Sequence, residues 1–225
     1  GGGGWASDTG GSNIARGSGY SQLNTTFRPY ITNQNSITNC FNAATNYGPV
    51  TANQGTYLGS IYATANGQTG MAYKPVAASG GNNNILGVFN AYNQVPTRAI
   101  SSESTSSWTY ATATWRPANN STSNRVSFLD GLQQSSIHGN YAAEIQSSGS
   151  GITGVVGVAL DSTTAPTRGA INQDNLVGAT LVTAVVDDVY LPQIGLHFVQ
   201  ALEFSSGATS TFFGLTNQGS AQSAA

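Results

Sequence analysis

The sequence predicts an all-β fold, an antiparallel β-sandwich with glycine- and serine-rich termini. Segments of roughly 5–10 residues are rich in aromatic and β-branched residues at a period of two, which is typical of strands. Turn sequences such as Asn66-Gly67 and Ser147 to Gly151 separate these segments. No long segment carries the 3.6-residue period of an amphipathic helix. Short strands at this spacing favour a two-layer sandwich, and the chain is long enough to bury one core.

The first 55 residues differ from the rest. Residues 1–20 contain mainly Gly, Ser and Asn around Trp5, too little apolar surface to offset the entropy of ordering, so we expect a linker or arm. Residues 21–55 carry apolar side chains without a sustained period and are expected to pack irregularly on the sandwich; Ser36 to Thr45 could form one short helix. The start on glycine, without Met, suggests processing from something longer.

The sandwich is expected over residues 56–215, followed by a flexible tail at 216–225. Gly59, Gly87, Gly154 and Gly157 interrupt predicted strands; such positions let another backbone come close, which has a use in an oligomer. The predicted strands, in order, are Thr56–Thr64, Asn84–Tyr92, Ser107–Trp115, Asn124–Leu132, Ile137–Gln146, Ile152–Asp161, Thr180–Val186, Gly195–Phe204 and Thr209–Phe213.

The chain is unusually poor in charge. Only 7% of its residues are charged, with Lys74 as the single lysine, against about 25% in an ordinary soluble domain. The net charge is −2 and the basic residues are scattered, so the sequence predicts no positively charged surface that would bind nucleic acid or an anionic membrane. No apolar run is long enough to span a bilayer. The chain has one cysteine, Cys40, which excludes an intrachain disulfide. We expect Cys40 to be a small buried residue.

No catalytic, cofactor or metal site is predicted, although several groups were weighed. His197 could join Asp187 or Asp188 and a serine, but no nucleophile-elbow motif supports a triad, so a hydrogen-bonded strand histidine is favoured. Asp187, Asp188 and Asp161 form the best oxygen-ligand set for a cation, yet Asp187-Asp188 is expected to end a strand and bind loop amides. A glycosidase pair could come only from Asp130, Glu144 and Glu203, for which an ion pair with Arg125 or an exposed strand position is preferred.

Aromatic residues are the one class that could serve binding. Ring faces beside many amide side chains are what a sugar-binding surface needs, although most rings are expected in the core or in subunit interfaces. The candidates for glycan contact are Tyr57, Tyr62, Tyr73, Trp108, Tyr110 and Trp115.

Three segments, NRVSFLDGLQQSSIHGNYAAEIQ, VGVALDSTTAP and GLHFVQALEFSSGATSTFFG, resemble in that order the C-terminal β-domains of tailed-bacteriophage virion surface proteins. The likeness covers Tyr57 to Leu215. It implies a jelly-roll-like homotrimer on the virion surface, a fibre or spike head without enzymatic activity that contacts other virion proteins and contributes to host adhesion. Two alternatives stay open: a capsid-decorating protein, and an extracellular carbohydrate-binding module.

Overall fold

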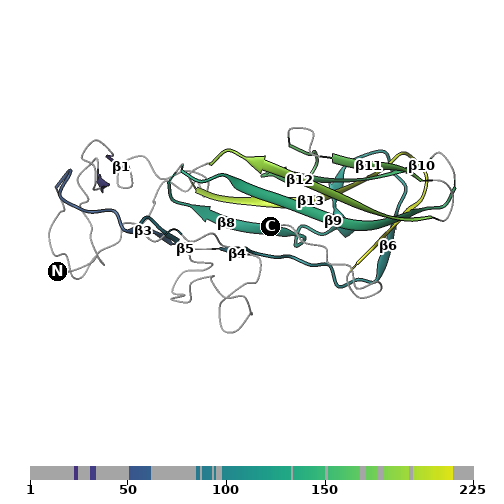
Figure 1. Cartoon of the computed structure of the whole chain (residues 1–225), viewed down its shortest axis with the longest axis horizontal. Coiled ribbons are helices and arrows are strands. Elements are labelled where there is room, and N and C mark those ends of the chain that lie inside the picture. The colour runs from purple at the N-terminus through teal and green to yellow at the C-terminus, as the bar shows by residue number, and fades with distance from the viewer. Residues whose placement is uncertain are drawn as a thin grey trace.

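The computed structural model describes residues 23–24, 31–33, 51–61, 85–86, 88–92, 94, 98–132, 134–149, 152–167, 171–176, 180–192 and 195–214. Most of the strand residues belong to two β-sheets, so the predicted all-β sandwich is confirmed (Figure 1). The predicted arm at 1–20, helix at 36–45 and tail at 216–225 lie outside the described residues. Within the described part, no helix has the length and apolarity needed to cross a membrane.

The larger sheet, sheet I, has the strand order β11-β10-β13-β8-β4, with β7 also paired to β13. Its pairs are antiparallel except for β4 and β8, which run parallel. Its strands are β4 (Ile85–Leu86), β7 (Arg116–Pro117), β8 (Arg125–Asp130), β10 (Ile152–Leu160), β11 (Ile171–Leu176) and β13 (Gly195–Ser205).

The second sheet, sheet II, has the antiparallel order β12-β9-β14-β6. It contains β6 (Ser107–Tyr110), β9 (Ile137–Ser147), β12 (Leu181–Tyr190) and β14 (Ser210–Phe213). Two short pairs lie outside the sandwich: β1 (Leu23–Asn24) with β2 (Thr32–Asn33), and β3 (Gly59–Ile61) with β5 (Val88–Asn90). A 3₁₀ turn, η1 (Ala118–Asn120), follows β7.

The core lies between the two sheets, because alternate residues of their strands point inward. On β9 the alternation is regular: Tyr141, Ala143 and Ile145 are buried, whereas the residues between them are half-buried. The fully buried side chains of the opposing sheet include Val156 and Val158 of β10. This interleaving of apolar residues from both sheets is the main source of hydrophobic stabilisation in the fold.

Strand β13 is buried on both faces from Val199 to Glu203, where five successive residues are buried. Val199 and Ala201 face the core, and Gln200 and Leu202, which alternate with them along the strand, are also inaccessible to solvent. The segment after β7 covers this second face: the Gln200 amide donates to the carbonyl of Asn124 at 2.8 Å. That segment therefore acts as a third, irregular layer over sheet I.

Four predicted strands differ clearly from the observed ones. The predicted strand Thr56–Thr64 begins only at Gly59, as β3, and the predicted strand Asn84–Tyr92 contains β4 and β5, which belong to different sheets. The predicted strand Ser107–Trp115 ends at Tyr110, where the Tyr110 hydroxyl bonds the Thr114 carbonyl at 2.8 Å and closes a turn. After the turn, the chain enters sheet I as β7, so Trp115 does not lie on the reverse face of β6. The predicted strand Thr180–Val186 instead continues to Tyr190, because residues 187–190 keep pairing with residues 137–140 of β9. Asp187 and Asp188 thus lie inside a strand and do not end it.

Two of the four glycines expected to allow close approach, Gly59 and Gly154, are needed inside the chain itself. A Cβ atom on Gly154 would lie 2.5 Å from Cγ2 of Ile145 across the core, which is closer than real contacts allow. A Cβ on Gly59 would collide with the backbone carbonyl of Phe89 on the neighbouring strand β5. Both glycines therefore serve intrachain packing.

Candidate functional site

A buried carboxylate joins the two sheets. Glu203 of β13 is inaccessible to solvent, and the β7–β13 register places Arg116 directly opposite it. Nε of Arg116 donates to Oε1 of Glu203 at 2.7 Å, and the indole Nε1 of Trp108, from β6 of sheet II, donates to Oε2 at 2.6 Å. Hydrogen bonds to a charged acceptor are stronger than neutral ones, so this triad fastens sheet I to sheet II.

The carboxylate of this triad is buried, whereas Arg116 keeps 24% side-chain exposure. Burial raises the pKa of Glu203, and the hydrogen bonds from Trp108 and Arg116, together with the Arg116 charge, offset part of that rise. The Arg116 guanidinium also lies 3.8 Å from the centre of the Tyr110 ring, a cation–π contact that holds it in place. Both oxygens of Glu203 have protein donors, so the arrangement is suited to holding the sheets together, not to acid–base chemistry.

A second buried carboxylate, Glu103, organises the loop that precedes β6. Its Oε1 accepts the Thr105 amide at 2.9 Å, and its Oε2 accepts Nδ2 of Asn124 at 2.8 Å. Asn124 also donates to the carbonyl of Ala118 at 2.9 Å. Glu103 and Asn124 line a polar pocket of about 290 Å³, together with Ile100, Ser101, Ser102, Ser104, Ser121 and Ser123.

The environment of Glu103 favours its charged form. Burial on its own would raise the pKa of this group, but hydrogen bonds from Asn124, from the amide and hydroxyl of Thr105 and from Asn119 together lower the pKa from 4.5 to about 2. The carboxylate therefore stays ionised in all but strong acid. Because its hydrogen bonds are directed at protein groups, it stabilises the loop.

We expect the Glu103→Gln variant to lose part of the pH dependence of stability in acid. The folded-state pKa lies below the unfolded value, so Glu103 contributes stability that is present above pH 4.5 and is lost as the pH falls towards 2. The contribution at neutral pH is on the order of 3 kcal/mol. Urea unfolding of both proteins at pH 7, 5, 3 and 2 should give curves that differ most at pH 7 and converge in acid.

The pocket neighbour Ser102→Ala is the control for this experiment, because it removes no titratable group. Its free energy of unfolding should equal that of the parent protein at every pH. A constant difference between Glu103→Gln and the parent across the whole pH range would contradict the prediction.

His197 pairs with Asp161, not with Asp187 or Asp188. Its Nδ1 lies 2.6 Å from Oδ2 of Asp161, and Oδ1 of Asp161 accepts the amide of Phe198 at 3.0 Å. The His197 side chain is 1% exposed. The pair fastens the end of β10 to β13. Among the described residues, no group of three or more His, Cys, Asp or Glu side chains is placed to hold a metal ion.

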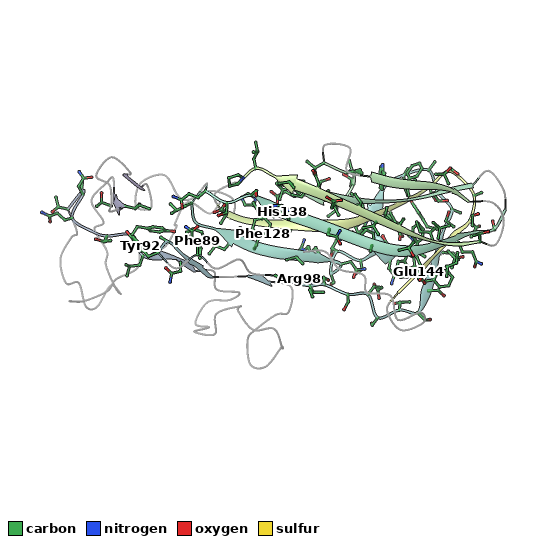
Figure 2. The ribbon with its side chains drawn as sticks, in the orientation of Figure 1. Phe89, Tyr92, Arg98, Phe128, His138 and Glu144 are labelled. Carbon is green, nitrogen blue, oxygen red and sulfur yellow. The ribbon has the colours of Figure 1, made fainter. Side chains whose placement is uncertain are left out.

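The three carboxylates considered for glycoside hydrolysis do not face a common cleft. Glu203 points into the core with Arg116, not Arg125, as its partner. Glu144 lies on the outward side of β9, opposite Thr183 of β12. Asp130 ends β8, is 9% exposed, and accepts the Leu132 amide at 3.0 Å. Figure 2 shows Glu144 and His138 at separate points along the sandwich.

The aromatic candidates for glycan contact are dispersed. Trp108 is 9% exposed and stacks on Phe212 with ring centres 6.1 Å apart, so its indole belongs to the core. Trp115 is half-buried against Phe204. Tyr110 lies under Arg116, and Tyr57 lies just before β3, at the opposite end of the molecule from β6 (Figure 1). Tyr62 and Tyr73 lie outside the described residues.

A more exposed aromatic side chain is Tyr92, just after β5. It is 52% exposed, and Leu58, whose carbonyl accepts the amide of Ala91 at 2.9 Å, is 66% exposed (Figure 2). Gln94 and Gln134 bond each other nearby at 2.9 Å, with Gln94 also donating to Ala91. A ring and amides at one surface combine the groups that sugars contact. Sequence reasoning placed Tyr92 at the end of a predicted strand, where nothing marks its ring as outward.

Exposed apolar side chains gather on β12. Among the described residues, the large exposed ones are Leu58, Tyr92, Ile100, Leu181, Val185, Val189 and Leu191, and four of these seven lie on β12 or directly after it. The neighbouring strand β9 continues the same outward surface. We call this surface the outer face of sheet II; it consists of Leu181, Thr183, Val185, Asp187 and Val189 of β12, opposite Gln146, Glu144, Ala142, Asn140 and His138 of β9.

No protein-family model, curated protein or solved structure matches the chain.

Proposed function

We propose that this chain is a non-enzymatic structural protein of a tailed phage, displayed on the virion surface as a trimeric fibre or spike head that contributes to host adhesion. The observation that carries the proposal is the outer face of sheet II, where apolar side chains stand exposed on β12. Exposed apolar rows of this kind mark protein–protein contacts. A subunit that works by associating with copies of itself and with other virion proteins needs such a surface.

The use of the polar groups supports a structural role. Glu203, Arg116 and Trp108 join the sheets, Glu103 and Asn124 fix a loop, and the His197–Asp161 pair fastens a turn. These carboxylate, imidazole and amide groups form hydrogen bonds with other groups of the same fold. Their burial stabilises the sandwich and leaves recognition to its surface.

The composition supports the same role. Because only 7% of the residues are charged, identical copies can approach without strong mutual repulsion. Adhesion is best supported at the surface of Tyr92, Leu58, Gln94 and Gln134, where an exposed ring lies beside amides. That surface also favours the second candidate function, an extracellular carbohydrate-binding module, since both roles use the same chemistry.

Sedimentation velocity at micromolar concentration tests the proposal. We expect a dominant species with three times the 23.1 kDa mass of the chain, or six times that mass when two trimers pair. A well-folded species at the mass of a single chain, with no larger one, would contradict the self-associating role. Binding to host cells and to empty phage heads then separates the alternatives: binding to heads without binding to host glycans would favour capsid decoration.

A further inference from the structure

We infer that the outer face of sheet II is a contact surface for a second copy of the chain, packed face to face and antiparallel about a two-fold axis that passes beside Val185. The inference rests on the self-association proposed above and names the surface that mediates it. This two-fold contact is separate from the three-fold contact of the proposed trimer, so it joins two trimers.

Side-chain exposure identifies the surface. Val185 is 45% exposed, Val189 is 43% exposed and Leu181 is 39% exposed, although all three belong to a ten-residue strand at the side of the sandwich (Figure 1). Single exposed apolar residues are normal on any protein; here three of them recur at every fourth position of one strand, with exposed Thr183 and Asp187 between them. Burial of such a row against another apolar surface gains roughly 25 cal/mol per Å².

The order of side chains on β12 is symmetric about Val185. Along the outward side it reads apolar, polar, apolar, polar, apolar from Leu181 to Val189. In an antiparallel arrangement centred on Val185, Leu181 meets Val189 of the partner subunit and Val185 meets its own copy. Thr183 then meets Asp187 of the partner subunit, so that a hydroxyl donor faces a carboxylate acceptor.

Strand β9 obeys the same symmetry, which is an independent check because its sequence is unrelated to that of β12. Ala142 lies opposite Val185 in the β9–β12 register, so it also sits at the two-fold axis and meets its own copy. Glu144 then faces Asn140 of the partner subunit, whose amide can donate to the carboxylate. Each polar group of the two strands faces a complementary one, and each apolar group faces an apolar one.

Charge distinguishes this arrangement from a parallel one. In the antiparallel pair the two Asp187 residues are four positions apart along the strand direction, roughly 14 Å, which exceeds the Debye length of about 8 Å at physiological salt. If β12 faced a three-fold axis with parallel strands, three Asp187 carboxylates would meet at one level, and so would three Glu144 carboxylates if β9 shared the contact. Like charges in contact are destabilising, so the two-fold arrangement is favoured.

Cysteine cross-linking tests the register. In a Cys40→Ser background, Val185→Cys and Ala142→Cys are each expected to give a dimer band with a short bis-maleimide, because each position meets its own copy. Thr183→Cys alone should give none, since its copies lie roughly 14 Å apart along the strands. A mixture of Thr183→Cys and Asp187→Cys chains should regain the band. The Cys40→Ser parent is the control for background reaction.

The possible outcomes distinguish failure of the inference from failure of the proposed function. Thr183→Cys linking to itself as well as Val185→Cys would indicate a parallel contact and overturn the inference. A chain that sediments as a multimer but links at none of these positions would also overturn it, while leaving the proposed function intact. A chain that sediments as a single copy would defeat both. Val185→Cys and Ala142→Cys occupy different strands, so a folding defect in one leaves the other as the test.

Discussion

Replacing Glu203 with alanine is expected to destabilise the fold by about 3–5 kcal/mol, because it leaves a buried ion-pair partner and a buried donor without their acceptor. Glu203 is inaccessible to solvent, and its two oxygens accept Arg116 at 2.7 Å and Trp108 at 2.6 Å. Arg116 retains 24% side-chain exposure, so its charge regains some water, which places the loss towards the lower end of this range. Urea unfolding at one fixed protein concentration measures the effect.

Two further variants separate the charge from the hydrogen bonds. Glu203→Gln keeps an acceptor for the Trp108 N–H and removes the cost of burying a charge. Its free energy of unfolding should therefore fall by less than that of the alanine variant. Trp108→Phe keeps a ring against Phe212 but leaves Oε2 of Glu203 without its donor, at a cost of about 1–3 kcal/mol. Equal stability of Glu203→Ala and the parent would show that the triad does not hold the sheets together.

The sheet-forming segments could be predicted because their apolar residues alternate. Ile137–Gln146 and Gly195–Phe204 each match a strand to within a residue at either end, since half or more of their side chains enter the core. Strand β11 escaped prediction because four of its six residues are polar and its pairing with β10 supplies the stability that its sequence does not signal. The break after Tyr110 depends on a bond to Thr114, and strand propensity alone does not reveal it.

The site could not be predicted, because its members meet only in three dimensions. Trp108 and Glu203 are 95 positions apart in the sequence, and Arg116 and Glu203 are 87 apart. The sequence around each residue also gives no sign of the contact. Trp108 is one of several aromatic residues in predicted strands, and Glu203 is one polar position in another predicted strand. The prediction that His197 is a hydrogen-bonded strand residue is confirmed. Its partner Asp161 could not be predicted, because the contact depends on the pairing of β10 with β13.

Replacing Phe212 with alanine is expected to cost about 3–5 kcal/mol, because the side chain is fully buried and its removal leaves a cavity that rigid strands cannot fill. Phe212 stacks on Trp108 and lies among residues of both sheets, so its loss also loosens the indole that binds Glu203.

The matched control is the next residue, Phe213→Ala. It has the same side chain on the same strand but points to the outward side of sheet II, where it is only half-buried. Its replacement should cost less than half as much, since less apolar surface is removed from the interior. Urea midpoints of the two variants at one protein concentration give the comparison. If both variants lost the same stability, β14 would not separate a core face from an outward face, and the packing of sheet II on sheet I described above would be wrong.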